Sequence, residues 1–536
     1  MSDSALHVPP AGAPHRPKLD HSGGRLTVMI FGGALVAGLA YTAFSLYQDY
    51  TATGVVATAY LPFVLLGVAL VIALGFEFVN GFHDTANAVA TVIYTNSMPA
   101  NVAVIWSGFF NFLGVIVASG AVAFGIISLL PVELILQVGS GAGFAMVFAL
   151  LIAAIIWNLS TWALGLPASS SHTLIGSIIG VGIANSLLMG GDGTSGVDWG
   201  KATEIGWSLL LSPLIGFGAA AILLLILKFT VRDPALYEAP KGDQPPPWWI
   251  RLLLIGTCTG VSFAHGSNDG QKGMGLIMLI LIGTVPMAYA LNRSVPDSEV
   301  VQFQAVAATA EAAFQKQAGN VAPPADVRAE MTRFIRDRKA TPETLPALGQ
   351  LSGEIGRQVA EYGGLNKVPT AAVSNMRNDM YLASEGIRFL DKAKAFNDET
   401  APIAKALKAD LDDATKFIPF WVKVAVAIAL GLGTMVGWKR IVITVGEKIG
   451  KTHLTYAQGA SAELVAAVTI GAADVYGLPV STTHVLSSGV AGTMAANRSG
   501  LQLSTIRNLL MAWVLTLPVA MALSAGLYVL FHALFV

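Results

Sequence analysis

Long apolar runs separated by short polar segments dominate this 536-residue chain. A helix needs about 20 apolar residues to cross the hydrocarbon core of a bilayer. Such runs lie at 26–47, 59–79, 102–128, 143–165, 205–230, 250–291, 418–437, 459–477 and 507–535. Two shorter runs, 173–189 and 485–496, follow polar motifs, and we interpret them as re-entrant or half helices. The pattern predicts an all-α polytopic membrane protein with about ten to twelve transmembrane helices, in which 250–291 forms one or two passes.

The composition narrows the class of protein further. The mean hydropathy is +0.62 and only 12% of the residues are charged, whereas an average soluble domain has about 25%. A net charge of −1 leaves no excess of basic groups for a nucleic-acid backbone, so we expect the lipid bilayer and no nucleic acid as a partner. The single cysteine, Cys258, excludes a disulfide framework and a cysteine-based metal site.

The charges divide the chain into regions. Residues 292–417 hold 16 of the 32 Lys and Arg residues and 17 of the 33 Asp and Glu residues. We predict a soluble, mainly helical insertion there. Around it we expect a disordered tail (1–25), an additional N-terminal transmembrane helix with a linker (26–58), a first transport repeat (59–230), a cytoplasmic linker (231–249) and a second repeat (250–291 and 418–536). Basic loops mark the cytoplasmic side, so a single pass over 250–291 would put the insertion outside and two passes would put it inside.

The two repeats are visible as two pairs of motifs. The segment 81–88, GFHDTANA, resembles 266–273, GSNDGQKG, and the segment 165–172, GLPASSSH, resembles 477–484, GLPVSTTH. Asp84 and His172 are 88 residues apart, and Asp269 and His484 are 215 apart; the excess of 127 is close to the length of the insertion. Repeats with interrupted apolar segments at matching positions are typical of secondary transporters, whose sites lie where the two repeats meet.

Two hydroxyl runs are the first candidates for substrate binding. Ser169, Ser170 and Ser171 follow a proline and precede a short apolar helix, and Ser481, Thr482 and Thr483 do the same in the second repeat. Hydroxyl groups and free N–H groups at a helix N-terminus favour an anion. Ordinary N-capping with nothing bound is the alternative for either run. Because the runs match in both repeats, we favour a substrate site.

Charged and amide groups lie in the other motif pair. Asp84, Asp269 and Lys272 stand in apolar surroundings, where an ionisable group lines a cavity or has a partner. A purely structural ion pair between Asp84 and Lys272 is the alternative. Lys272 and the amide groups of Asn87, Asn268 and Gln271 are further candidates for binding the substrate. Two helix N-termini and a cation that neutralises the carboxylates suit the symport of a tetrahedral oxyanion.

Three further groups are candidates for carrying protons. His83 adjoins Asp84, and a histidine exchanges a proton in the physiological pH range. Glu77 lies seven residues before Asp84, on about the same face of a continuous helix. Glu463 lies within an apolar span ahead of the second G-L-P motif. A hydrogen-bonded buried acid without transport chemistry is the alternative for each glutamate.

These motifs resemble the PiT family of inorganic phosphate transporters, which carries a G-A-N-D-x-A-N-A type signature and a P-x-S-x-T-H type motif in each repeat. The segments 78–88 and 265–273 look most like the bacterial low-affinity Pit branch. The resemblance implies an inverted-repeat transporter, often a dimer, that moves phosphate with a cation across the bacterial inner membrane. In that branch the carried species can be a neutral complex of phosphate with a divalent metal, and the sequence leaves free phosphate open as well.

The chain departs from the family pattern at two positions. His83 stands where the family has the asparagine of the first N-D pair, and Lys272 stands where it has an asparagine three residues after the second aspartate. An ammonium group can replace the charge of Na⁺ permanently. We therefore expect coupling to H⁺ rather than to Na⁺, with no cofactor; if Na⁺ is bound instead, Asp84 and Asp269 are its expected ligands.

Other functions remain as alternatives from the sequence. The same fold could carry sulfate, but sulfate cannot donate a hydrogen bond to the retained aspartates, which favours phosphate. An intramembrane hydrolase is disfavoured because the neighbours Ser171 and His172 would not face each other at a helix start and because the whole set is duplicated. A channel or sensor, with the insertion as a regulatory domain, lid or folding spacer, is the third alternative.

Overall fold

The computed structural model describes residues 17, 19, 25–55, 60–191, 193 and 197–536, without the side chains at 26, 27, 85–87, 297 and 535. Throughout this part of the chain the regular structure is helical, with one isolated β-bridge between Gly450 and Leu501. The all-α class is thereby confirmed. Of the predicted N-terminal tail, only residues 17, 19 and 25 are described.

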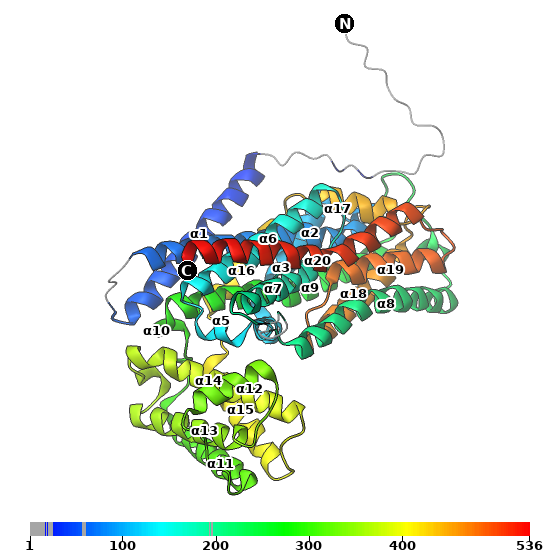
Figure 1. Ribbon diagram of the computed structural model, residues 1–536. Coiled ribbons are helices and arrows are strands. Elements are labelled where there is room, and N and C mark those ends of the chain that lie inside the picture. Colours follow the sequence, from blue (N-terminus) through cyan, green and yellow to red (C-terminus); the bar gives the residue numbers. More distant parts are fainter. Residues whose placement is uncertain (1–16, 18, 20–24, 56–59, 192, 194–196) are drawn as a thin grey trace.

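Helices of the first repeat, with the additional helix α1, form one part of a bundle that we call the membrane body (Figure 1). They are α1 (Arg25–Ala52), α2 (Leu61–Tyr94), α3 (Ala100–Val117), α4 (Ala121–Ile127), α5 (Val132–Leu136), α6 (Gly141–Ala163), α7 (Ser170–Leu188) and α8 (Trp199–Thr230). The second repeat supplies α9 (Trp248–Thr284), α10 (Pro286–Tyr289), α16 (Phe420–Thr434), α17 (Lys439–Ile443), α18 (Tyr456–Val475), α19 (Thr482–Ala496) and α20 (Leu503–Phe535).

The insertion forms a separate helical unit against one end of the membrane body (Figure 1). Its helices are α11 (Val300–Ala318), α12 (Val327–Asp337), α13 (Thr344–Tyr362), α14 (Thr370–Lys392) and α15 (Thr400–Thr415). Phe314, Met331, Leu348 and Leu411 are fully buried among them. Such apolar burial is the main stabilising contribution to helix packing outside a membrane, and the buried cluster of the insertion is continuous with that of the membrane body.

Seven helices in the described residues are long and apolar enough to cross a bilayer, namely α1, α2, α3, α6, α7, α8 and α20. α15 and α16 together form one further candidate with a bend of 70°. α9 and α18 belong to the same bundle but carry buried polar and charged side chains within their apolar stretches. α16 and α19 are only 15 residues long. The stretch 250–291 forms a single long helix, α9, followed by the short α10.

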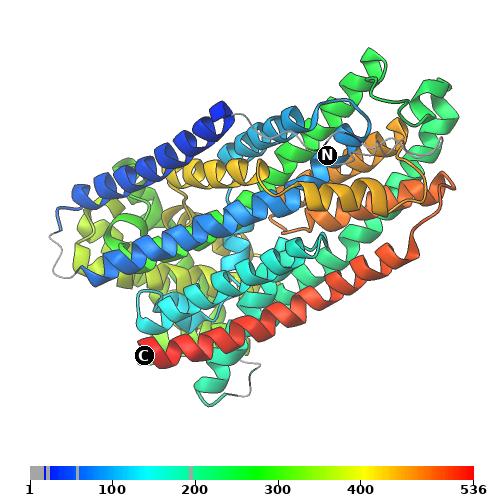
Figure 2. The ribbon, with the colours of Figure 1, turned by 90° about the horizontal axis from the view of Figure 1, so that it is seen from above.

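The two repeats are interlocked through α7 and α19, the helices that follow the two G-L-P motifs; α7 is long enough to span the bilayer, whereas a half helix was predicted there. α8 of the first repeat packs along α19 of the second, and α20 of the second repeat packs along α7 of the first. Seen from above, red α20 runs along one side of the body beside the cyan helices (Figure 2). A Cβ atom on Gly216 would lie 2.3 Å from the carbonyl oxygen of Val485, and one on Gly180 would lie 2.2 Å from that of Met521. Glycine therefore permits the close helix contacts that are typical of membrane interiors.

Candidate functional site

The N-termini of α7 and α19 face each other in the membrane body. Ser169 caps α7 by accepting a hydrogen bond from the His172 amide (3.2 Å), and Ser481 caps α19 in the same way from His484 (3.1 Å). The imidazole rings of His172 and His484 have centroids 4.6 Å apart. The first hydroxyl of each run is thus an ordinary N-cap. The two positive helix ends point into one buried region.

Asp84 on α2 accepts hydrogen bonds from hydroxyl groups on both α7 and α19. The Ser170 hydroxyl donates to Asp84 Oδ2 (2.6 Å), and the Thr483 hydroxyl donates to Asp84 Oδ1 (2.7 Å). His83 Nδ1 lies 2.9 Å from the same Oδ1, and His83 Nε2 lies 3.1 Å from the hydroxyl of Thr161 on α6. The carboxylate of Asp84 therefore joins the two repeats through hydrogen bonds.

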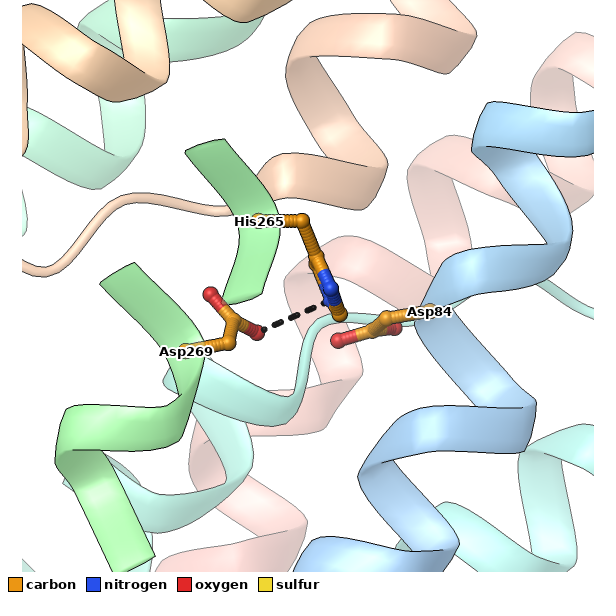
Figure 3. A group of neighbouring side chains, drawn as sticks. All are labelled: Asp84, His265 and Asp269. Carbon is orange, nitrogen blue, oxygen red and sulfur yellow. Dashed lines mark ion pairs between the residues drawn. The ribbon is translucent and has the colours of Figure 1, made fainter. Parts of the chain in front are cut away.

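Asp269 on α9 has a different set of partners. Lys272 Nζ lies 2.8 Å from Asp269 Oδ2, His265 Nε2 lies 3.5 Å from it, and the Ser170 hydroxyl lies 3.3 Å from it. Ligand atoms of Asp84, His265 and Asp269 all lie within 4.8 Å of one another (Figure 3). We call Asp84, Asp269, Ser170, Thr483, His83, His265 and Lys272 the central cluster; all seven residues are buried. Lys272 thus forms its ion pair with the aspartate on its own helix. The alternative given from the sequence was a structural ion pair between Lys272 and Asp84.

The other predicted substrate-binding residues differ in whether their polar atoms already have hydrogen-bond partners in the protein. Ser171 donates to the carbonyl oxygen of Val480 (2.7 Å), whereas the buried Thr482 hydroxyl has no hydrogen-bond partner among the described residues. Asn268 donates to the carbonyl oxygen of Leu478 (3.1 Å), and its own side-chain oxygen has no partner there. The side chain of Asn87 lies outside the described residues. Thr482 and Asn268 therefore retain polar atoms for a ligand.

Gln271 is held by the protein itself. Its Nε2 donates to the Ser267 carbonyl (2.8 Å) and to Asp474 (2.5 Å), and its Oε1 accepts from the Val122 amide (2.9 Å). Since both ends of the amide have protein partners, its role in this conformation is to fasten α9 to α4 and α18.

The two candidate glutamates lie outside the central cluster and are hydrogen-bonded to other residues. Glu77 accepts from Asn80 Nδ2 (3.4 Å) and lies against α9 where Gly273 lacks a side chain; a Cβ atom there would be 2.3 Å from Glu77 Cγ. Glu463 on α18 accepts hydrogen bonds from Thr91 and from Thr257 (2.5 Å). Both are fully buried, as a proton carrier or a structural acid would be, so their part in transport stays a prediction.

Three residues join the site that were not among the predicted site residues. His265 is one helical turn before Asp269, a spacing that the sequence already contained. Asn111 on α3 contacts His265 Nδ1 through its Oδ1 (2.7 Å). Asp474, three residues before the second G-L-P motif, accepts from Ser267 (2.6 Å) and Gln271. An acidic residue in an apolar span was the available signal for Asp474, but no motif singled out Asn111.

The arrangement combines donors for an anion with carboxylates for a cation. Two helix N-termini offer positive potential, and the Thr482 hydroxyl, which has no partner among the described residues, is a donor. Asp84 and Asp269 offer ligand oxygens and proton sites in a buried setting, where electrostatic interactions are strong. An interlocked helical membrane bundle whose two repeats meet at such a site is typical of a secondary transporter.

Comparison with known proteins agrees with this class. Residues 80–524 match the phosphate transporter family. The chain belongs to this family, so the predicted resemblance is confirmed, and the protein is a multi-pass membrane transporter and not an enzyme. The hydrolase alternative is thereby excluded.

The relatives cover nearly the whole chain. The low-affinity inorganic phosphate transporters PitA and PitB of Escherichia coli K12 are 43% and 42% identical over 87% of this chain and 96% of their own length. A probable low-affinity inorganic phosphate transporter of Bacillus subtilis is 29% identical over 88% of this chain and 99% of its own. Among solved structures, a sodium-dependent phosphate transporter aligns with a TM-score of 0.48 and 20% identity over 87% of this chain and 98% of that one.

Proposed function

We propose that the protein takes up inorganic phosphate across the cell membrane by symport with a proton. The names of PitA and PitB, which describe low-affinity inorganic phosphate transporters, support phosphate as the substrate. The site supports the same choice, since two helix N-termini and several hydroxyl groups suit a tetrahedral oxyanion. Phosphate at neutral pH can also donate a hydrogen bond to Asp84 or Asp269, which sulfate cannot do.

The ion pair between Lys272 and Asp269, at 2.8 Å, is the observation that carries the choice of the proton. The ammonium group supplies permanently the positive charge that a sodium ion would bring to that carboxylate. The basic neighbour of Asp84 is instead a histidine, His83, at 2.9 Å. A proton taken up by this His–Asp pair neutralises the remaining negative charge. The phosphate anion then binds without repulsion.

The same geometry supports a proposal for the form in which phosphate is carried. Carboxylate oxygens of Asp84 and Asp269 and an imidazole nitrogen of His265 lie within 4.8 Å of one another. Carboxylate oxygens suit Mg²⁺ or Mn²⁺, and an imidazole nitrogen suits ions such as Zn²⁺ or Fe²⁺. We infer that a divalent metal bound to phosphate can be part of the cargo, with these three side chains contacting the metal while Thr482 and the helix N-termini contact the phosphate.

Uptake of labelled phosphate into proteoliposomes tests the proposal, with pH and sodium gradients imposed separately. We expect accumulation driven by an inward proton gradient in sodium-free buffer; strict dependence on sodium would contradict proton coupling. Unlabelled sulfate in excess should leave uptake unchanged, and full competition by sulfate would favour the oxyanion alternative. Labelled Mn²⁺ should enter together with phosphate, and uptake that is unaffected by chelation of divalent ions would rule out the metal complex.

A further inference from the structure

A cavity of about 300 Å³ lies between the membrane body and the insertion. We call it the interface cavity. One wall consists of α4 with the start of α8 and the last turns of α9, and the other consists of α14 and α15. A water molecule needs only about 10–15 Å³ of such volume. The interface cavity therefore has room for a small anion with part of its hydration shell.

Arg377 on α14 is the notable side chain of this cavity. It lines the cavity with only 7% of its surface exposed. Its Nη1 donates to the Ile135 carbonyl oxygen (3.3 Å) and to Asn378 Oδ1 (3.1 Å), and among the described residues no carboxylate forms an ion pair with it. Burial lowers the pKa of Arg377 below its ordinary value, and Tyr381 opposes this only in part. A buried guanidinium without a counter-charge is costly, so an anion in the cavity would be stabilising.

The other basic side chains of the cavity lining each form an ion pair, but the lining as a whole has more basic than acidic side chains. Arg388 lies 2.6 Å from Glu385, and Lys416 lies 2.8 Å from Asp412. Lys201 lies 2.8 Å from Glu204, which is not among the lining residues. The lining thus carries four basic side chains and two acidic ones. Walls of low polarity concentrate such a positive potential within the cavity.

α4 contacts both the interface cavity and residues that adjoin the substrate groups. On the cavity side, Ala121 and Gly125 line the wall, and both lie against Gly477; a Cβ atom on Gly477 would lie 3.2 Å from that of Ala121. Gly477 begins the G-L-P turn that leads to Thr482. Towards the site, the Val122 amide donates to Gln271, two residues from Asp269. α4 therefore links the wall of the cavity to the G-L-P turn and to Gln271.

The interface cavity lies at the end of α9 opposite to the basic loops. α9 begins just after the linker that carries Lys241 and ends next to the insertion. As one helix of 37 residues, about 55 Å long, it is long enough to cross the bilayer once. Basic loops lie on the cytoplasmic side, so a single crossing by α9 places the insertion and its cavity on the external side, from which the substrate arrives.

We propose that the interface cavity is an anion-binding vestibule in which Arg377 binds phosphate from the external side before it reaches the central cluster. This rests on the proposed function for the identity of the anion. The insertion is then a functional part of the transport path, because α14 supplies the guanidinium group. Phosphate oxygens suit the planar guanidinium, which can donate two parallel hydrogen bonds.

A cysteine at Ser128 gives a direct measurement. Ser128 lines the cavity and is half-buried, whereas the chain's one cysteine, Cys258, is fully buried. In purified S128C protein, a negatively charged thiol reagent should react at this position, and inorganic phosphate should slow the reaction. R377Q should raise the phosphate concentration for half-protection by roughly tenfold or more. R377K, which keeps the charge, should retain part of the protection.

Two controls separate the vestibule from other effects. R357Q removes a guanidinium that is exposed on the insertion and pairs with Glu311; protection should be unchanged. D84N disables the central cluster, and phosphate protection at S128C should persist in that background. Absence of protection by phosphate in protein that transports phosphate would overturn the vestibule, as would equal protection in R377Q. If uptake fails but protection depends on Arg377, the vestibule stands and the proposed function fails.

Discussion

The ammonium group of Lys272 lies 2.8 Å from Asp269 Oδ2, one helical turn away on α9, and both side chains are fully buried. Each of two charges that are removed from water in this way is stabilised by the other, and removal of one partner lowers the free energy of unfolding by about 3–5 kcal/mol. The lysine thus acts as a fixed counter-charge at the centre of the protein. A bound cation would otherwise have to fill that role.

Replacement of this lysine should change the coupling ion. In K272N the family's asparagine returns, Asp269 loses its counter-charge, and proton-driven uptake in sodium-free buffer should fall by about 100-fold or more. Sodium should restore part of the uptake, and K272R should retain more of it than K272N. Lys241, an exposed lysine paired with Glu238, provides the control K241Q, which should transport normally. Undiminished sodium-free uptake by K272N would refute the role assigned to Lys272.

The unpaired hydroxyl of Thr482 should matter for phosphate but not for folding. T482V removes a buried hydroxyl that has no partner among the described residues, so the melting temperature should stay the same or rise. Loss of one hydrogen bond to a charged ligand should weaken phosphate binding by roughly tenfold to a hundredfold. In T493V, whose hydroxyl bonds within α19 to the Val490 carbonyl (2.8 Å), binding should be unchanged. Calorimetric titration and thermal unfolding measure the two effects; normal binding by T482V would exclude the contact.

The contact between α7 and α20 should tolerate no added methyl group. G180A places a Cβ atom 2.2 Å from the Met521 carbonyl oxygen, and the helices must separate at a cost of about 1–3 kcal/mol. A Cβ atom on Gly206 in α8 would meet no described atom within 4 Å, so G206A should be neutral or slightly stabilising. Thermal unfolding in detergent compares the two. Equal melting temperatures would mean that α7 and α20 are not held at this distance.

Attachment of the insertion should weaken in acid. Asp198 precedes α8, and its carboxylate lies 3.0 Å from Arg388 and 3.6 Å from Arg338. Burial raises the pKa of Asp198, but Arg338, the Lys201 amide and Arg388 together outweigh it and hold the pKa below the ordinary 3.8. The stabilisation is therefore fully present above pH 3.8 and is lost as the pH falls through the lowered value.

Hydrogen exchange of α14 measures this attachment. D198N should increase exchange in α14 at neutral pH, and the wild-type protein should approach the D198N behaviour only below pH 3.8, once intrinsic exchange rates are taken into account. D233N provides a control, since Asp233 caps a short turn at the other end of α8. Identical protection of α14 in D198N and the wild type would show that the carboxylate does not hold the insertion.

Much of the central site follows from the repeat alone. Matching hydroxyl runs after two prolines predicted that two helix N-termini meet. In the structure the hydroxyls of Ser170 and Thr483 both donate hydrogen bonds to the carboxylate of Asp84. Fold class and family were likewise available, because spans and motifs are local features of the sequence. The partner of Lys272 was also encoded locally, since residues three apart on a helix are neighbours.

The rest depends on packing that no local pattern reveals. Gln271 resembled a ligand for substrate, yet the Val122 amide and Asp474 occupy both ends of its side chain. Glu463 is held by Thr91 and Thr257 from two other helices. Arg377 belongs to an ordinary amphipathic helix, and only the docking of the insertion makes it a buried charge. Such contacts join residues far apart in the sequence.

Helices of each repeat pack along helices of the other, and this affects the order in which the fold can form during synthesis. α7 is buried along α20, which the ribosome synthesises long after α7. Until then α7, which carries Ser170 and Ser171, lacks the neighbour that shields much of its surface. A chain truncated before Leu503 would therefore leave the face of α7 that packs along α20 uncovered, even though every motif residue has been synthesised. The burial of α7 is thus complete only once α20 is in place, and we expect chains that end before α20 to be lost from the membrane.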